Sequence, residues 1–275
     1  MPELPEVENV VKSILKNIKG SKIIKMYILW SKLIRNIDKE EFIKIVTNKN
    51  INNVWRKGKY IIFDIETHRL VCHLRMEGKW FFLKNGKIDE YKHSTAVFIF
   101  DNGCTGYFVD TRKFGTFDLV KKDDLKLIAG IAKLGTDAND ININEKEVFV
   151  KISKTSRPIK TVLLDQTVIA GIGNIYADEI LFKSNIHPLK KGKSFSQELV
   201  TRIIKNSKVI LDLAISYGGS TVKTFEISHG NSGNFAQFLN VYQRQNKPCT
   251  VCEGVIKRIV ISGRGTHFCE SCQHY

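Results

Sequence analysis

Four cysteines near the C-terminus constrain the fold of this chain more than any other feature. They form two Cys-x2-Cys pairs, Cys249 with Cys252 and Cys269 with Cys272, which are separated by 16 residues. This spacing is typical of a four-cysteine zinc site, in which the thiolates complete a tetrahedral shell and leave no position for water. Two disulfides are the alternative, which a reducing compartment disfavours. We therefore expect one structural Zn²⁺ ion here.

Composition indicates a soluble protein with a polyanionic partner. The 275 residues are enough for two domains with separate cores. No apolar run approaches 18 residues and the N-terminus lacks a signal-peptide core, so we expect a cytoplasmic protein that has no membrane partner. The net charge is 43 − 28 = +15, which favours nucleic acid because each neutralised phosphate releases counterions. The alternative is the codon bias of an AT-rich genome, with lysines that only solvate the surface.

The hydrophobic pattern predicts a β-rich half followed by a helical half. Apolar residues recur at helical spacing from Val7 to Ile18. Glycine-punctuated runs then predict a β-sandwich, with strands over residues 23–29, 51–56, 60–65, 70–74, 80–83, 96–100 and 107–109. Cys72 and Cys104 lie in apolar runs and should be buried. Further helices are predicted over residues 121–130, 145–153, 159–164, 175–182 and 196–216.

The fold class that follows is α+β with two domains and a zinc finger. We predict an N-terminal β-sandwich domain with an N-terminal helix over residues 1–130 and a linker over residues 131–144. A helical domain should cover residues 145–240, and the zinc finger residues 241–275. Within the finger, the β-branched run from residue 255 to 261 and the following Ser-Gly-Arg-Gly-Thr predict a hairpin whose turn presents Arg264.

The N-terminal sequence Met-Pro-Glu-Leu-Pro-Glu-Val-Glu suggests a nucleophile. Removal of Met1 would leave Pro2 with a free secondary amine, and an α-amino group titrates at about pH 7.7 to 8.0, so part of it is unprotonated at physiological pH. Glu3 would lie close enough to move protons. The alternative is an ordinary helix start, because Pro5 suits a first turn and Glu6 complements the helix dipole.

Several other motifs are ambiguous by themselves. Gly171-Ile-Gly-Asn174 precedes a predicted helix and suits a phosphate, although such glycines often serve only close packing. Lys59 at a strand start and His73 within a strand are more often structural or solvated residues. The segment from residue 110 to 115 places a cation and an aromatic ring two residues apart, on one side of an extended chain.

Taken in order, these motifs resemble the bacterial formamidopyrimidine-DNA glycosylases over nearly the whole chain. The matching segments are the N-terminal Pro-Glu-Leu-Pro-Glu-Val-Glu, Gly58-Lys59-Tyr60, the His73 to Gly78 segment, Asp110 to Gly115, Asp165-Gln166 with Gly171 to Glu179, and the four-cysteine finger. The resemblance implies a helix-two-turn-helix DNA-binding domain and one structural zinc ion. It also implies a bifunctional glycosylase and lyase that removes 8-oxoguanine and formamidopyrimidines from duplex DNA by β,δ-elimination.

The resemblance also implies a role for individual residues. Pro2 would be the nucleophile, Glu3 the general acid, Lys59 an aid to β-elimination, and Arg264 the residue of the δ-elimination step. The residues expected to contact DNA are Glu6, His73, Met76, His93, Arg112, Phe114, Lys160 and Asn174. Met76, Arg112 and Phe114 would fill the gap left by the extruded nucleotide. The expected partner is damaged double-stranded DNA, bound by a monomer at the bacterial nucleoid.

Some positions depart from the family pattern. Gln243 and Asn246 stand where glycines are usual, which predicts a different turn before the finger hairpin. Thr95 replaces a common histidine beside His93, and Thr111 replaces a frequent proline. Residues 218–225 correspond to the segment that closes over the extruded base.

Two other functions remain open from the sequence. An endonuclease VIII type enzyme would share the fold and amine but prefer oxidised pyrimidines, although Leu4 stands where that branch often has glycine. A non-catalytic zinc-finger DNA-binding protein would have lost the chemistry, which the presence of both Pro2 and Glu3 disfavours.

Overall fold

The computed structural model describes residues 1–220 and 233–275, which form two compact units. The first, here called the sandwich unit, comprises Met1–Ala132 and Gly218–Asn234. The second, here called the helical unit, comprises Lys133–Tyr217 and Phe235–Tyr275. Within the described residues, no helix is both long enough and apolar enough to cross a membrane.

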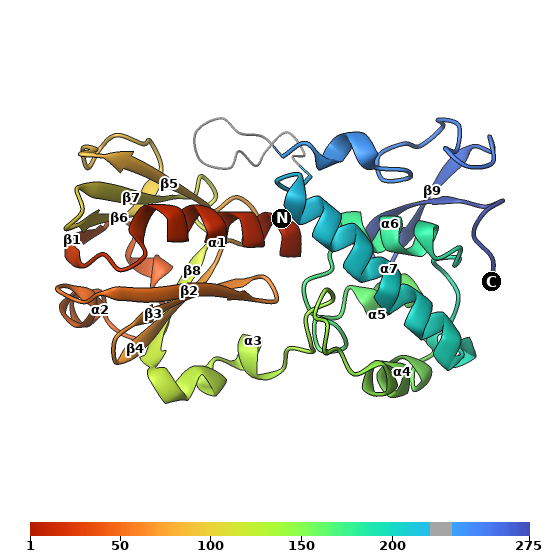
Figure 1. The fold of residues 1–275 in the computed structure, drawn as a ribbon, viewed down its shortest axis with the longest axis horizontal. Helices are drawn as coiled ribbons and strands as arrows, with labels where there is room; N and C mark the ends of the chain where they lie inside the picture. The colour runs from red at the N-terminus through yellow and green to blue at the C-terminus, as the bar shows by residue number, and fades with distance from the viewer. Residues whose placement is uncertain (221–232) are drawn as a thin grey trace. The chain divides into compact units, whose positions relative to one another are not determined.

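The sandwich unit contains two antiparallel four-stranded sheets, with strand orders β1-β6-β7-β5 and β2-β3-β4-β8 (Figure 1). The strands are β1 (Ile23–Ile28), β2 (Ile51–Lys57), β3 (Tyr60–Ile65), β4 (His68–His73), β5 (Lys79–Lys84), β6 (Ser94–Phe100), β7 (Cys104–Val109) and β8 (Thr116–Lys121). The β-sandwich prediction is therefore confirmed. Its inner faces hold an aromatic core around Trp80, whose ring lies 5.4 to 6.0 Å from five others, those of Phe63, Phe82, Phe98, Phe108 and Phe117.

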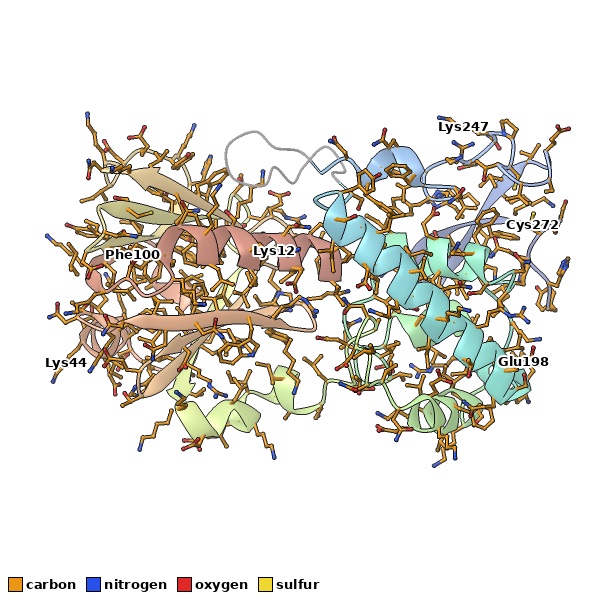
Figure 2. All side chains as sticks on the ribbon, in the orientation of Figure 1. Lys12, Lys44, Phe100, Glu198, Lys247 and Cys272 are labelled. Atoms are coloured by element: carbon orange, nitrogen blue, oxygen red, sulfur yellow. The ribbon has the colours of Figure 1, made fainter. Side chains whose placement is uncertain are left out.

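Helix α1 (Leu4–Ile18) contacts both sheets of this unit (Figure 1). Its buried apolar side chains follow the predicted helical stripe and join the aromatic core. The outer surface is lysine-rich, with Lys12 and Lys44 exposed, whereas Phe100 is buried (Figure 2). The helix thus fixes the N-terminus to the buried core of the unit, whereas an unattached chain end would fray.

The helical unit is built from α4 (Glu145–Ser153), α5 (Ile159–Leu163), α6 (Asn174–Lys183) and α7 (Gln197–Ser216), followed by the hairpin of β9 (Ile256–Ile261) and β10 (Arg264–Cys269). Short 3₁₀ turns η3 (Gly192–Ser194) and η4 (Phe235–Phe238) connect these elements. Ser196 caps α7 by accepting the N–H of Leu199 at 3.3 Å. Helix α6 is buried along nearly its whole length, so it can position side chains on several sides.

Within the described residues, a helix, a strand and three 3₁₀ turns were not predicted from the sequence, and one segment was predicted in the wrong form. Helix α2 (Lys39–Val46) and strand β8 were not predicted, and the segment predicted as one helix over residues 121–130 forms η2 (Lys122–Leu127) and the short α3 (Ala129–Ala132). The turns η1 (Ser31–Leu33), η3 and η4 were also missed. Residues 122–127 contain three acidic or basic residues in succession and no fully buried side chain. Leu125 packs only partly buried against the cluster of Ile128 and Ile131, so little apolar contact stabilises a longer α-helix there.

Candidate functional site

The N-terminal segment is held in place by a buried carboxylate pair at the start of α1. Pro2 and Glu3 are both buried, whereas Met1 is 54% exposed. Glu3 caps α1, and Glu6 accepts the N–H of Glu3 at 2.9 Å while the Glu3 side chain accepts the N–H of Glu6. Pro2 is therefore a fixed residue, as a reactive chain terminus must be.

Glu6 also anchors the segment that follows α7. Its other carboxylate oxygen accepts the N–H of Ser220 at 2.9 Å and the hydroxyl of Ser220 at 3.2 Å, and both residues are buried. Gly219, with φ of +87°, leaves the space that a Cβ would take 2.8 Å from Glu6 Oε1. One carboxylate thus joins the Pro2 segment to the first residues of the expected base-capping segment, residues 218–225, of which 221–225 lie outside the described residues.

We expect Glu6→Ala to lower the free energy of unfolding of the sandwich unit by about 2 kcal/mol or more, because three accepted hydrogen bonds disappear and their buried donors stay unpaired. All three tryptophans, Trp30, Trp55 and Trp80, belong to this unit, so urea denaturation followed by tryptophan fluorescence measures it selectively. The control is Glu40→Ala in the first turn of α2, where the side chain is exposed. Equal losses in the two variants would contradict the anchoring role.

Lys59 lies in the tight turn between β2 and β3 and is 6% exposed. Arg56 fixes this turn, because its guanidinium donates to Glu8 Oε2 of α1 at 3.0 Å and to the carbonyl of Gly58 at 3.1 Å. The same helix that holds Pro2 therefore also holds the turn that carries Lys59. Arg56 could not be identified from the sequence, because one of its partners lies far away in the chain and the other is a backbone carbonyl.

His73 ends β4 and is neutral at physiological pH. Burial, followed by the nearby cations Arg75, Lys59 and Arg35, lowers the pKa of His73 to about 3. Its Nδ1 accepts the N–H of Arg75 at 2.9 Å, and Tyr60 contacts the ring edge-on at 4.6 Å between centroids. Because Nδ1 is an acceptor, the neutral ring carries its proton on Nε2, a hydrogen-bond donor suited to a phosphate oxygen.

We expect the stability of the sandwich unit to fall as the pH drops from about 6.5 towards 3, since the unfolded state binds a proton that His73 rejects when folded. Protonation of this histidine in the unfolded state lowers the free energy of unfolding by about 2 kcal/mol at pH 5 relative to pH 7. Urea denaturation of wild type and His73→Gln at both pH values measures this loss, since the variant lacks the imidazole. If the free energies of unfolding of wild type and His73→Gln differ by the same amount at pH 7 and at pH 5, His73 is not a buried neutral imidazole.

Two loops present the expected wedge residues to solvent: Met76 lies between β4 and β5, and Arg112 and Phe114 lie between β7 and β8. Met76 is 41% exposed and Phe114 is 52% exposed, and the Arg112 guanidinium lies 4.8 Å from the centre of the Phe114 ring. Asp110, buried at 1% exposure, shapes the second loop by accepting the N–H groups of Arg112 at 3.1 Å and Gly115 at 2.6 Å. No role for Asp110 was predicted from the sequence, although an Asp two residues before Arg112 is typical of a turn in which the carboxylate accepts backbone N–H groups.

His93 is exposed and precedes β6. Its carbonyl accepts the N–H of Asp110 at 3.1 Å, so His93 adjoins the loop that carries Arg112. Thr95, where the family commonly has histidine, is buried and donates its hydroxyl to the carbonyl of Phe108 at 3.0 Å.

The helical unit carries the other predicted residues. Arg264 is exposed at the start of β10, after a two-residue turn in which Ser262 and Gly263 have φ of 48° and 73°. Lys160 and Asn174 both donate to the carbonyl of Gly265, at 2.9 and 3.1 Å. Lys160 is fully buried, with its ammonium 2.7 Å from Asp178 Oδ1.

The four C-terminal cysteines form a cluster that fits one zinc ion. Their Sγ atoms all lie within 4.8 Å of one another, with Cys249 and Cys272 at 3.8 Å and Cys252 and Cys269 at 3.4 Å. These distances are far above the 2.05 Å of a disulfide and near the roughly 3.8 Å between thiolates that each bind zinc at about 2.3 Å. The zinc prediction is confirmed over the disulfide alternative. Zinc would supply structural closure of the finger, since four thiolates leave it no open position.

The two remaining cysteines are buried and unpaired, as predicted. Burial raises the pKa of both the Cys72 and the Cys104 thiol, which keeps them protonated and unreactive.

Before the finger, the chain turns without the usual glycines. Gln243 and Asn246 have φ of 57° and 63°, the left-handed conformation that glycine adopts without steric cost. The prediction of a different turn at these residues is therefore not supported by the backbone. The carbonyl of Ile256 accepts the N–H of Asn246 at 2.9 Å, which ties the turn to the hairpin.

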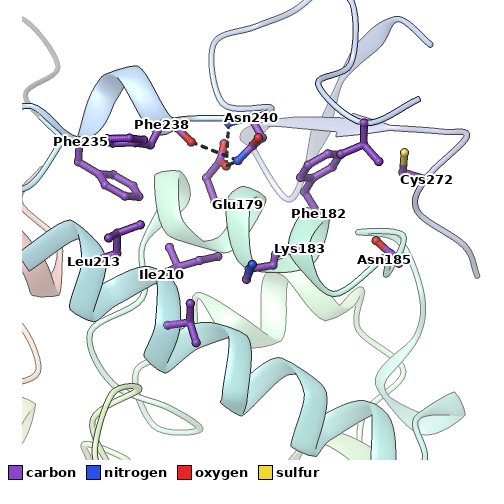
Figure 3. Close-up of a pocket in the computed structure, with 12 residues that line it drawn as sticks. Glu179, Phe182, Lys183, Asn185, Ile210, Leu213, Phe235, Phe238, Asn240 and Cys272 are labelled. Carbon is purple, nitrogen blue, oxygen red and sulfur yellow. Dashed lines mark hydrogen bonds between the residues drawn. The ribbon is translucent and has the colours of Figure 1, made fainter. Parts of the chain in front are cut away.

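Glu179 attaches this segment to α6. The carboxylate accepts the backbone N–H of Asn240 at 2.9 Å (Figure 3). It also accepts the backbone N–H groups of Val241 and Tyr242, each at 2.9 Å. Burial raises the pKa of Glu179, although these hydrogen bonds oppose the shift. An adjacent pocket of about 320 Å³ includes Cys272 in its wall and is otherwise mostly apolar, with Phe182, Val209, Ile210, Leu213, Phe235, Phe238 and Val251.

Three family models match the chain in succession. The formamidopyrimidine-DNA glycosylase N-terminal domain matches residues 1–117, the formamidopyrimidine-DNA glycosylase H2TH domain residues 134–226, and the zinc finger found in FPG and IleRS residues 246–274. The formamidopyrimidine-DNA glycosylase of Listeria monocytogenes serotype 4b is 39% identical over 273 residues, which cover 99% of this chain and 100% of the relative. That of Bacillus anthracis is 38% identical over 275 residues, 99% of each chain.

Solved structures agree with these matches. A Lactococcus lactis FPG variant in complex with a Fapy-dG containing DNA has a TM-score of 0.92 and 35% identity, and the match covers 100% of both chains. The Lactococcus lactis Fpg in complex with an abasic site containing DNA has the same TM-score and identity, over 99% of this chain and 100% of that one. The chain therefore belongs to the formamidopyrimidine-DNA glycosylase family.

Proposed function

We propose that the chain is a DNA repair enzyme that excises oxidised purines, such as 8-oxoguanine and formamidopyrimidines, from duplex DNA and then cleaves the strand as an abasic-site lyase. The observation that carries this proposal is the Pro2-Glu3 pair, buried and locked to α1 by the capping box with Glu6. A buried carboxylate beside a potential N-terminal imine-forming amine is what a glycosylase with lyase activity needs. The complexes of the Lactococcus lactis relative with Fapy-dG and abasic-site DNA support the choice of substrate.

In the proposed mechanism, the Pro2 amine, freed of Met1, attacks C1′ of the damaged nucleotide. The N-glycosidic bond breaks and the base leaves with a proton, while Glu3 protonates the ring oxygen so that the sugar opens to an iminium. The cationic iminium makes the C2′ proton acidic, and its loss expels the 3′ phosphate in β-elimination. A second proton loss expels the 5′ phosphate in δ-elimination. General acid and base catalysis of this kind typically contributes about 10² to 10⁴-fold.

Access to C1′ requires the nucleotide to leave the base stack, which costs a few kcal/mol. We assign this step to Met76, Arg112 and Phe114, whose exposure suits wedges that replace the lost stacking. The stacked guanidinium of Arg112 would face the orphaned base. Glu6 would lie at the extruded nucleotide, because it anchors the start of the segment expected to close over the base.

The remaining residues would bind the DNA backbone. Lys59 would grip a phosphate near the lesion and assist β-elimination, and His73 would donate from Nε2. We assign His93 and Asn174 to backbone contacts, and Arg264 to the phosphates beside the damage and to δ-elimination. Lys160 also matches a family position near the DNA backbone, although its ammonium is buried against Asp178. The net charge of +15 supports this partner. We propose that the protein acts as a monomer in the cytoplasm, at the bacterial nucleoid.

Borohydride trapping tests the proposal. The processed chain is incubated with duplexes that contain either 8-oxoguanine opposite cytosine or an oxidised pyrimidine, and borohydride then reduces any imine to a stable adduct. We expect an adduct with the purine duplex. An adduct with only the pyrimidine duplex would indicate an endonuclease VIII type enzyme, and no adduct with either would indicate a DNA-binding protein without this chemistry.

A further inference from the structure

The outer edge of β10 is attached to the helices by side chains. Arg264 pairs with Ile261 at the hairpin turn, and in an antiparallel pair alternate residues exchange the ladder hydrogen bonds. The next residue, Gly265, and then His267 fall on the positions whose backbone groups point away from β9. Their partners come from α5 and α6: the carbonyl of Gly265 accepts from Lys160 and Asn174, and the N–H of His267 donates to Asp178 Oδ2 at 2.9 Å.

Asp178 is the common element of this attachment. Its Oδ1 lies 2.7 Å from the Lys160 ammonium, and its Oδ2 also lies 3.3 Å from Nδ1 of His267. The side chains of Asp178 and Lys160 are 0% and 1% exposed. Such a buried lysine needs a buried counter-ion, so Asp178 determines where the ammonium lies. The ammonium in turn holds the carbonyl one residue from Arg264.

We propose that Asp178, with Lys160 as its counter-ion, is a positioning residue that holds Arg264 in place for δ-elimination. This inference rests on the proposed function, in which Arg264 acts on the phosphates beside the lesion. Lys160 then affects the reaction indirectly, because its ammonium contacts Asp178 and the carbonyl of Gly265 and so holds the hairpin turn beside Arg264. The turn is a two-residue connection with positive φ at Ser262 and Gly263, and the side chain of Arg264 beyond it is exposed. The described side-chain contacts to this edge of the hairpin therefore come from α5 and α6.

The test compares elimination products rather than overall activity. Zinc-loaded full-length wild type, Asp178→Asn and Arg264→Ala are incubated with a duplex that contains an abasic site, and the ratio of δ- to β-elimination products is measured. We expect Asp178→Asn to lower this ratio at least fivefold, towards that of Arg264→Ala, with one zinc ion retained per chain. A folded, zinc-loaded Asp178→Asn protein with the wild-type ratio would overturn the proposal.

A second variant separates the effect of Asp178 on the position of Arg264 from its effect on the stability of the protein. Asp178→Asn leaves the Lys160 charge without a counter-ion, so the single variant could fail to fold; Lys160→Met combined with Asp178→Asn removes both charges. We expect the double variant to retain zinc and to match the thermal stability of wild type but to keep the low product ratio, because Gly265 has lost its ammonium donor. A wild-type ratio in the folded double variant would also overturn the proposal. The matched control is Glu147→Gln, which breaks the exposed ion pair with Lys151 in the same unit and should change nothing.

Amide hydrogen exchange of residues 262–267 separates this inference from the proposed function. We expect exchange there to be at least tenfold faster in the double variant than in wild type, whatever the chemistry. A wild-type protein that forms no borohydride adduct would refute the proposed function, while faster exchange would still support Asp178 as the residue that fixes the turn. Unchanged exchange would refute the positioning role itself.

Discussion

We expect a chain that retains Met1 to excise 8-oxoguanine at least about 10³-fold more slowly than the processed chain, with affinity for duplex DNA within about threefold. The nitrogen of Pro2 in a Met1–Pro2 peptide bond is an amide, whose lone pair is delocalised into the carbonyl and cannot attack C1′. The amine of Met1 is a poor substitute, because it lies one residue away, about 3.8 Å along the chain, and Met1 is 54% exposed. Mass spectrometry of the intact protein verifies the terminus, and single-turnover excision measures the effect.

The comparison needs a second variant that keeps an amine. Pro2→Gly in the processed chain retains a primary amine at the same position but loses the ring that fixes the backbone before α1. We expect a severe loss of excision with duplex binding retained, as measured by fluorescence anisotropy at constant salt. Equal excision rates for processed protein and protein with Met1 demonstrably present would refute the nucleophile assignment.

Elements with a strong local pattern could be predicted from the sequence, and elements defined by distant partners could not. The stripe of α1 and the hairpin turn before Arg264 depend on spacing and on turn residues within a few positions. Helix α2 has eight residues, of which four are charged, so its two buried side chains gave little periodicity. Strand β8 belongs to its sheet because it pairs with β4, which lies far earlier in the sequence.

The candidate site shows the same division. The residues proposed to react could be named from the sequence because their types and order match the family, whereas several residues that hold them in place could not. Glu179 and Asp178 bind backbone groups 61 to 89 residues away, and Arg56 binds Glu8, which is 48 positions away. A carboxylate on a helix gives no sequence indication of which distant N–H it accepts. Supporting residues therefore emerge only from the folded structure.

We expect removal of zinc to unfold the finger and leave the sandwich unit intact. The apolar cluster of the finger is small, with Val241 and Ile256 from the finger segment packed on Phe182 and two of the zinc ligands. A segment of this size cannot bury enough apolar surface to fold alone, and zinc typically supplies about 10 to 16 kcal/mol of apparent binding energy at pH 7. Chelation should therefore abolish exchange protection of residues 246–275, while the urea transition reported by the three tryptophans of the sandwich unit stays unchanged.

Removal of zinc should also weaken duplex binding by at least about tenfold at physiological salt. The reason is that residues 244–275 carry five Lys or Arg and two Asp or Glu, a net charge of 5 − 2 = +3. Cys269→Ser should reproduce the effect without a chelator, since its thiol is a fully buried member of the cluster. Cys104→Ala is the matched control, because that cysteine lies in β7, outside the cluster, and should leave one zinc ion per chain. Protection and binding retained by a protein shown to be zinc-free would mean that hydrogen bonds from α6, such as those of Asp178 and Glu179, are sufficient to fold the finger. If the zinc-free protein loses exchange protection and duplex binding while the zinc-loaded protein keeps them, zinc folds the finger. The hydrogen bonds of Asp178 and Glu179 then only hold the folded finger against α6.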